Sequence, residues 1–164
     1  MAGVTILLPS AGELDRTSLI VAMGDLGIRL CDIDLPLAQA APFATRVCAA
    51  IQQARPAAPL LIVAPPASAA HLPAIALAQR TARRRVTAYV LLEPGLLEVA
   101  ASPSGADWPD APVTCISLQT TMPDWVRLRD WQSVCCQSME GAAKVIEACQ
   151  DSLPAGANPI NDLR

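Results

Sequence analysis

The chain has 164 residues, which is long enough for one domain with a sizeable buried core. Its net charge of -3 and its 3% of aromatic residues argue against a nucleic-acid partner, because such partners need basic surfaces and stacking side chains. The hydrophobic fraction of 52% is high and the charged fraction of 16% is low, so either the core is unusually large or a partner covers apolar surface.

The first residues carry no basic region before a short apolar run, which does not match a signal peptide. No stretch approaches the roughly 18 apolar residues of a membrane span, so we expect a cytoplasmic protein. In that compartment the six cysteines are expected to be free thiols. A single histidine and the lack of a Cys-x-x-Cys motif predict no metal site, and the glycine-poor first loop predicts no nucleotide or flavin cofactor.

Apolar runs alternate with segments of helical periodicity, which predicts alternating strands and helices. The predicted strands cover residues 4–9, 28–35, 60–63, 86–92, 113–118 and 133–138. The predicted helices cover residues 14–26, the segment between Pro42 and Pro56, and residues 69–83, 122–131 and 139–152. We expect residues 1–153 to form a single α/β domain with a turn-rich connection over 93–111, followed by a flexible tail over 154–164.

Several local signals set the expected helix ends. Gly27 is a plausible stop for the first helix, and Pro73 is tolerable in the first turn of the helix over 69–83. The basic run 83–85 is expected to be a solvated helix end rather than a binding patch.

The central strands are continuous apolar runs, which is typical of a parallel sheet with helices on both faces. We therefore expect a three-layer fold with a six-stranded sheet in the order 2-1-3-4-5-6. The helices over 14–26 and 69–83 are apolar on several faces, and this predicts a protein partner or a homo-oligomer.

In such a sheet the ligand crevice lies where the strand order reverses, between the first and third strands. The loops there contain Ser10, Ala11 and Gly12 after the first strand, and Pro66, Ala67 and Ser68 after the third. Main-chain N–H groups at such strand-to-helix turns suit an anion or an oxyanion. The alternative is that small residues simply permit tight turns.

The segment over residues 60–72 resembles the strand, nucleophile elbow and helix of α/β-hydrolases. The family pattern is an apolar strand, then G-x-S-x-G, then an Ala/Leu-rich helix. Ala64 stands at the first glycine, Pro66 at the nucleophile and Ser68 at the last glycine. The resemblance covers about residues 4–153 and starts at the family's third strand, so the usual first two strands are missing.

The resemblance implies a nucleophile at the elbow, an acid after a later strand and a histidine after the last strand. Pro66 cannot act as a nucleophile, whereas Glu93 could stand at one of the acid positions. The loop after the last strand contains Ser138 and Glu140 but no histidine. Ser138 is expected to line the same pocket as Ser68. The chain therefore resembles a shortened α/β-hydrolase whose catalytic triad is absent.

Other groups remain candidates for residual chemistry. In a shifted register Ser68 would be the elbow serine, with His71 three residues further along the same helix. Cys135 and Cys136 are adjacent in the last strand, so at least one should lie in the core. Glu140 could replace the missing histidine or could simply complement the helix dipole.

These observations favour an accessory or binding protein that acts with a protein partner and takes, at most, a small acyl or peptide ligand. Alternatives are a non-hydrolytic isomerase, epimerase or cyclase, an atypical esterase or thioesterase, and a flavodoxin-like protein. The abundance of Ala, Pro and Arg is typical of GC-rich bacterial genomes, where divergent hydrolase-like proteins often serve natural product biosynthesis.

Overall fold

The computed structural model describes residues 3–97 and 102–152, and the predicted tail over 154–164 lies outside them. Strands and helices alternate along the chain, as predicted. In order, the elements are β1 (Val4–Leu7), α1 (Arg16–Asp25), β2 (Leu30–Asp32), α2 (Phe43–Ala54), β3 (Leu60–Ala64), α3 (Pro66–Ala69), α4 (Leu72–Thr81), β4 (Val86–Leu92), η1 (Pro94–Leu96), β5 (Val113–Ser117), α5 (Asp124–Arg127), β6 (Gln132–Cys135) and α6 (Met139–Asp151).

The six strands form one parallel sheet in the order β2-β1-β3-β4-β5-β6, which confirms the predicted topology. β1 pairs with β3 so that Ile6 lies opposite Ile62, and every residue of β3 is buried. A strand that is covered on both faces must be apolar on both faces, which explains the uninterrupted apolar run at 60–64.

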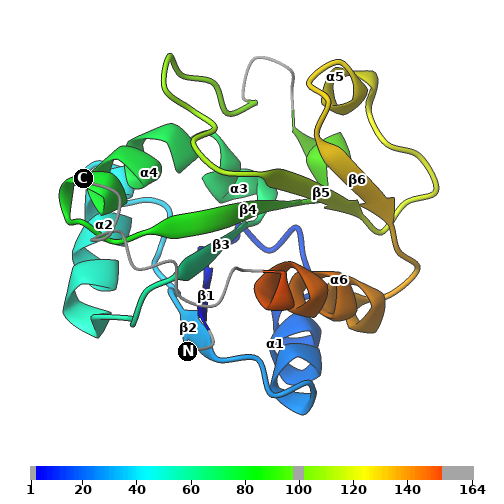
Figure 1. Ribbon diagram of the computed structural model, residues 1–164, viewed down its shortest axis with the longest axis horizontal. Coiled ribbons are helices and arrows are strands. Elements are labelled where there is room, and N and C mark those ends of the chain that lie inside the picture. Colours follow the sequence, from blue (N-terminus) through cyan, green and yellow to red (C-terminus); the bar gives the residue numbers. More distant parts are fainter. Residues whose placement is uncertain (1–2, 98–101, 153–164) are drawn as a thin grey trace, which may run out of the picture.

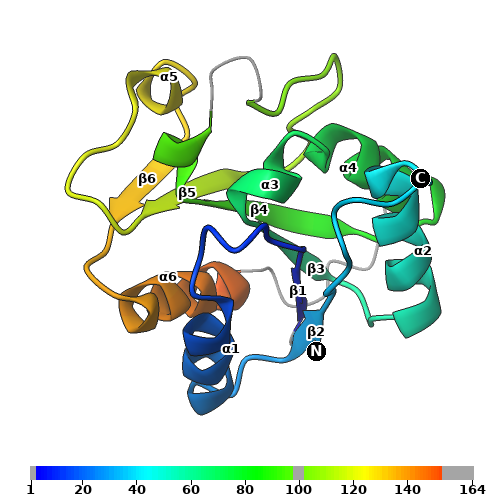
Figure 2. The same ribbon diagram turned by 180° about the vertical axis from the view of Figure 1, so that it is seen from behind.

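Two layers of helices cover the sheet (Figures 1 and 2). On one face α2 and α4 pack side by side over residues such as Ile62, and Val126 of α5 joins the same apolar cluster. On the other face α1 packs against α6 over residues such as Val63. The predicted three-layer arrangement is confirmed.

Helix ends follow local backbone chemistry. The N–H of Gly27 bonds to the carbonyl of Gly24, and the N–H of Ile28 bonds to the carbonyl of Met23. This pair of bonds is a Schellman motif, which requires a residue with positive φ, and Gly27 has a φ of +70°. The predicted stop at Gly27 is confirmed. Residues 83–85 follow the end of α4, as expected for a solvated helix end.

The predicted helix over 69–83 is wrong at its start, because the chain forms two helices there. α3 ends at Ala69 and α4 begins at Leu72. Pro73 lacks an N–H and its ring would clash with the carbonyl four residues earlier, so one continuous helix through Ala69 is excluded. Pro73 instead occupies the first turn of α4, where no such bond is needed.

Three other elements are shorter than predicted. β2 has three residues because it is an edge strand that pairs only with β1. α5 begins after Pro123 and ends at Arg127, and the positive φ of Asp130 excludes the expected continuation to 131. β6 stops at Cys135, so Cys136 lies outside the strand. Neither cysteine is buried, contrary to the expectation that one would lie in the core.

Helices α1 and α4 each expose an apolar side chain to solvent. Val21 is 58% exposed and Leu77 is 57% exposed, although their neighbours Met23 and Ile75 are fully buried. Within the described ranges, no helix has both the length and the apolar character needed to cross a bilayer.

Candidate functional site

The loops after β1 and β3 meet where the strand order reverses, at the position predicted for a ligand crevice. The N–H of Leu8 bonds to the carbonyl of Val63 at 2.9 Å, which keeps the two strand ends adjacent. Beyond them, the β1–α1 loop contains Ser10, Ala11 and Gly12, and α3 starts immediately after Pro65. The predicted loop residues are therefore brought together.

Pro66 is the buried first residue of α3. A nucleophile elbow holds its reactive side chain on a strained turn. The positive φ values among the described residues fall at other positions, such as Glu93 and Gly12, and Pro65 has an ordinary φ of -61°. The turn after β3 is thus an unstrained helix start. A pyrrolidine ring, which carries no transferable proton, stands at the position that the sequence resemblance aligns with the nucleophile.

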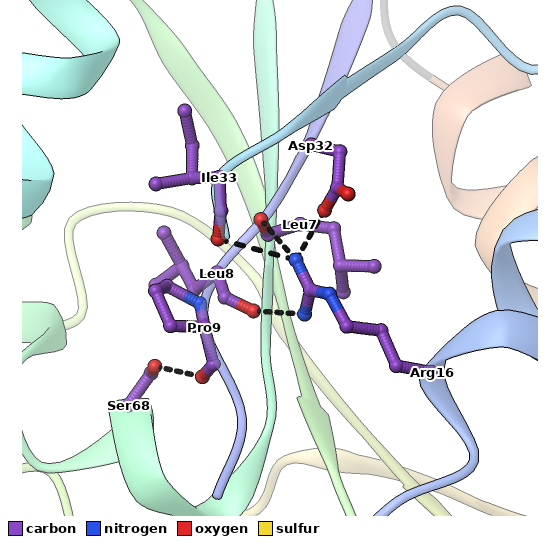
Figure 3. Close-up of polar contacts among 7 residues, drawn as sticks. All are labelled: Leu7, Leu8, Pro9, Arg16, Asp32, Ile33 and Ser68. Atoms are coloured by element: carbon purple, nitrogen blue, oxygen red, sulfur yellow. Dashed lines mark hydrogen bonds and ion pairs between the residues drawn. The ribbon is translucent and has the colours of Figure 1, made fainter. Parts of the chain in front are cut away.

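Ser68 is fully buried, and its hydroxyl faces the β1–α1 loop. Its Oγ donates a hydrogen bond to the carbonyl of Pro9, as Figure 3 shows. A buried carbonyl that loses its only partner costs free energy, so this bond has a clear structural role. It joins α3 to the loop after β1.

Glu13 lies half-buried between the same two segments. Its Oε1 accepts from the N–H of Ala67 at 3.2 Å, and its Oε2 accepts from the N–H of Ala11. In nucleophile-elbow enzymes the oxyanion is bound by the N–H after the nucleophile and by an N–H from another strand-to-helix loop. In this chain the Glu13 carboxylate accepts from one main-chain donor in the β1–α1 loop and one in α3.

Arg16 fastens the opposite side of the β1–α1 loop (Figure 3). Its guanidinium donates to the carbonyls of Leu7, Leu8 and Ile33 and forms an ion pair with Asp32. These acceptors lie at the C-terminal ends of β1 and β2. The planar fork of arginine can reach several acceptors at once, so one side chain ties both strand ends to α1.

The His71 ring does not contact the Ser68 hydroxyl as a catalytic base would. The two residues meet through their main chains, where the N–H of His71 bonds to the carbonyl of Ser68 at 3.1 Å. The imidazole ring instead packs on Phe43, with 4.7 Å between ring centroids. Burial lowers the pKa of His71 from its usual value. Because Ser68 belongs to α3 and His71 precedes α4, the expected shared helix face is wrong.

Glu93 is buried at the end of β4, in the left-handed conformation with a φ of 47°. Its carboxylate accepts from the N–H of Leu118, and its own N–H bonds to the carbonyl of Ile116 at 2.7 Å. Glu93 thus links the end of β4 to the end of β5. Its carboxylate is occupied by a main-chain donor.

Ser138 and Glu140 lie on a separate groove between α1 and α6. Ser138 is the N-cap of α6, and its Oγ accepts from the N–H of Gly141 at 3.1 Å. The groove encloses about 460 Å³ and is also lined by Asp15, Val21 and Asp25. The two residues therefore belong to a different surface from Ser68 and Ala11.

Five of the six cysteines do not provide an activated thiol in this structure. Burial raises the pKa of five of the thiols, most strongly for Cys115, where it reaches about 12. The other four are Cys31, Cys48, Cys136 and Cys149. A nucleophilic cysteine needs a lowered pKa, so these five favour the thiol form. Across residues 3–97 and 102–152, no group of three potential metal ligands comes together.

Glu13 and Arg16 were missed when the site was predicted from the sequence. Both lie just beyond the loop residues that were named. Glu13 accepts from main-chain N–H groups, and Arg16 donates to main-chain carbonyls and to the Asp32 carboxylate. One signal was present in the sequence. Gly12 precedes Glu13, and a glycine at a loop corner allows the positive φ of +88° that is found there.

No family model matches this sequence, and no curated protein matches it. Among solved structures, the chain is similar to the NocB thioesterase domain, in a crystal structure of its covalent complex with a fluorophosphonate nocardicin G analogue. The two share 14% sequence identity and superpose with a TM-score of 0.59, over 91% of this chain and 95% of that chain. Together with the strand order, this likeness shows that the chain has a three-layer, six-stranded α/β-hydrolase-like fold.

Proposed function

We propose that this chain is an α/β-hydrolase-like accessory or binding protein that carries out no acyl transfer through a serine, histidine and acid triad. The observation that carries the proposal is the buried ring of Pro66 at the place where the fold presents a nucleophile. Acyl transfer by this route begins with deprotonation of a hydroxyl or thiol, and proline has neither.

The positions of the remaining candidate groups support the same proposal. Ser68 donates its hydroxyl to Pro9, His71 packs on Phe43, and the Glu93 carboxylate accepts from Leu118. A triad requires the nucleophile to bond to the base and the base to bond to the acid. Here each group contacts a structural partner instead.

An atypical thioesterase is the second candidate, because the fold resembles a thioesterase domain. Ser68 would have to be its nucleophile, and it would first have to leave its bond to Pro9. An isomerase, epimerase or cyclase that uses Glu140 would instead have to act in the groove between α1 and α6. Natural product biosynthesis stays part of the proposal, since the neighbour was crystallised with a nocardicin G analogue.

We also propose that a partner chain covers apolar surface of this protein. Val21 on α1 and Leu77 on α4 are more than half exposed. Among the described strands β2 is an edge strand, which a partner could cover. Sedimentation of the purified 17.2 kDa chain tests self-association first. A species heavier than one chain supports a homo-oligomer, and a monomer at every concentration overturns it.

The rates at which the chain hydrolyses acyl N-acetylcysteamine thioesters and p-nitrophenyl esters test whether it carries out acyl transfer. We expect equal rates with the wild-type chain, with Ser68→Ala and with the matched surface variant Ser104→Ala, and no saturation by substrate. Saturable turnover that disappears only in Ser68→Ala would establish the thioesterase alternative instead.

A further inference from the structure

The helices on the two faces of the sheet carry opposite charge. The sequence has no acidic residue between Asp34 and Glu93, a stretch that contains both α2 and α4, and all its charged residues are arginines. On the other face, α1 ends on Asp25, and acidic residues outnumber basic ones in α6. Opposite charge on two faces of one molecule favours contact between copies of that molecule.

The groove between α1 and α6 combines an exposed apolar side chain with carboxylates. Val21, which is 58% exposed, and Met139 line it together with Asp15, Asp25 and Glu140. Asp15 also caps α1, whereas none of the three carboxylates takes part in an ion pair with another described residue. The groove therefore suits an occupant that is apolar at its centre and positively charged around it.

The outer surface of α4 has that composition. Leu77 is 57% exposed, and Arg80 lies three residues further along the same side of the helix. The Nε of Arg80 is 3.4 Å from a carboxylate oxygen of Asp110, and 41% of the arginine side chain still faces solvent. Arg83 is exposed in the turn after α4, where its N–H bonds to the carbonyl of Arg80 at 2.9 Å. We call Leu77, Arg80 and Arg83 the α4 surface.

We propose that the α4 surface docks into the groove between α1 and α6 of a second copy of this chain. In that contact Leu77 covers Val21, so two exposed apolar side chains leave water together. Arg80 and Arg83 then lie near the carboxylates that line the groove, where opposite charges set the orientation of the contact. This inference rests on the proposed partner chain, and it identifies that partner as the chain itself.

The placement of the two surfaces determines the kind of assembly. α4 packs on one apolar cluster of the sheet, and α1 and α6 pack on the other, so the surfaces lie on opposite sides of the molecule (Figures 1 and 2). One neighbouring chain cannot occupy both surfaces. The contact is therefore head-to-tail, and its repetition gives rings or open chains.

Analytical ultracentrifugation of two complementary variants tests the proposal. Leu77→Gln removes the apolar contact of the α4 surface and leaves the groove intact. Asp25→Arg reverses one charge of the groove and leaves the α4 surface intact. Each variant alone should associate about 10-fold more weakly than the wild-type chain, or weaker still. An equimolar mixture should form heterodimers and nothing larger, because only one intact contact can be made.

Leu128→Gln and Asp124→Arg are the matched controls. Asp124 begins α5 and Leu128 is its C-cap, so the controls change the same residue types outside both surfaces. Both controls should associate like the wild-type chain. Wild-type assembly that the controls weaken as much as Leu77→Gln and Asp25→Arg do would overturn this interface, and so would a mixture without heterodimers. Neither result would affect the ester and thioester assays.

The salt dependence of wild-type assembly is a second measurement, and it needs no variant. Association should weaken several-fold between about 50 mM and about 500 mM sodium chloride, because salt screens the exposed charges of the contact. Assembly that salt leaves unchanged or strengthens would overturn this interface and leave a homo-oligomer of another kind standing. A wild-type chain that stays monomeric at every concentration would overturn both.

Discussion

The hydroxyl of Ser68 donates a hydrogen bond to the main-chain carbonyl of Pro9, across 59 residues of sequence. Ser68 is fully buried, so the bond is shielded from water. It joins the first turn after β3 to the loop after β1, at the point where the strand order reverses. The Ser68 hydroxyl is therefore engaged in a bond that joins two loops of the fold.

Ser68→Ala should lower the free energy of unfolding by about 1–3 kcal/mol, because the Pro9 carbonyl would stay buried without a partner. Urea denaturation measures the change. Ser104→Ala, at an exposed site, should stay within about 0.5 kcal/mol of the wild-type chain. Equal stability of the two variants would mean that the Ser68 hydroxyl has no structural role.

Arg16→Lys should cost about 1.5–3 kcal/mol of unfolding free energy. A single ammonium cannot reach the carbonyls at the ends of both β1 and β2. Each lost hydrogen bond to a charged group costs about 1.5–3 kcal/mol. Arg29→Lys is the matched control at an exposed position. If urea titrations show the same small loss of unfolding free energy in both variants, Arg16 does not hold the two strand ends together.

Much of the fold could be predicted because burial on two sides leaves a plain signal in the sequence. The run at 60–63 was predicted as a central strand, and the reversal of strand order was predicted to bring the loops after β1 and β3 together, as it does. That these loops line a ligand crevice stays a prediction. Edge elements were harder to bound, because β2 and β6 pair on one side only. The break between α3 and α4 depends on the clash of the Pro73 ring, which helical periodicity alone does not reveal.

The candidate site was only partly predictable. Residues in the two meeting loops were named correctly as neighbours, because parallel strand ends share one edge of the sheet. Glu13 was missed because its partners are main-chain N–H groups, and no side-chain motif identifies those. Ser138 and Glu140 were grouped with Ser68 by family position, whereas α6 presents them on the α1 side of the sheet.

Thiol reagents should modify Cys135 first in the folded chain, since it is the exposed cysteine. Burial, and then the nearby Cys135, raise the pKa of Cys136. Cys115 is fully buried and its pKa is about 12, so it should react only after unfolding. Mass mapping after brief iodoacetamide treatment checks the order, and Cys135→Ser should remove the fast phase. Rapid labelling of Cys115 in the folded chain would contradict this account.

Acidification should destabilise the wild-type chain more than His71→Phe, which keeps a ring against Phe43. Burial lowers the pKa of folded His71, so the unfolded chain takes up the proton first as the pH falls below about 6.5. The free energy of unfolding that the neutral ring contributes is fully present above about pH 6.5. It is lost as the pH falls from there to the lowered pKa of folded His71. Urea titrations at about pH 7.5 and about pH 5.5 measure the difference between the two chains. A difference that does not change with pH would show that His71 titrates normally.

We expect no reactive hydroxyl at the turn after β3. Intact mass after prolonged exposure to a fluorophosphonate probe measures this directly, with peptide mapping to locate any adduct. The account predicts an unchanged mass, because Pro66 stands at the elbow and Ser68 is bonded to Pro9. A stoichiometric adduct on Ser68, absent from Ser68→Ala, would contradict it.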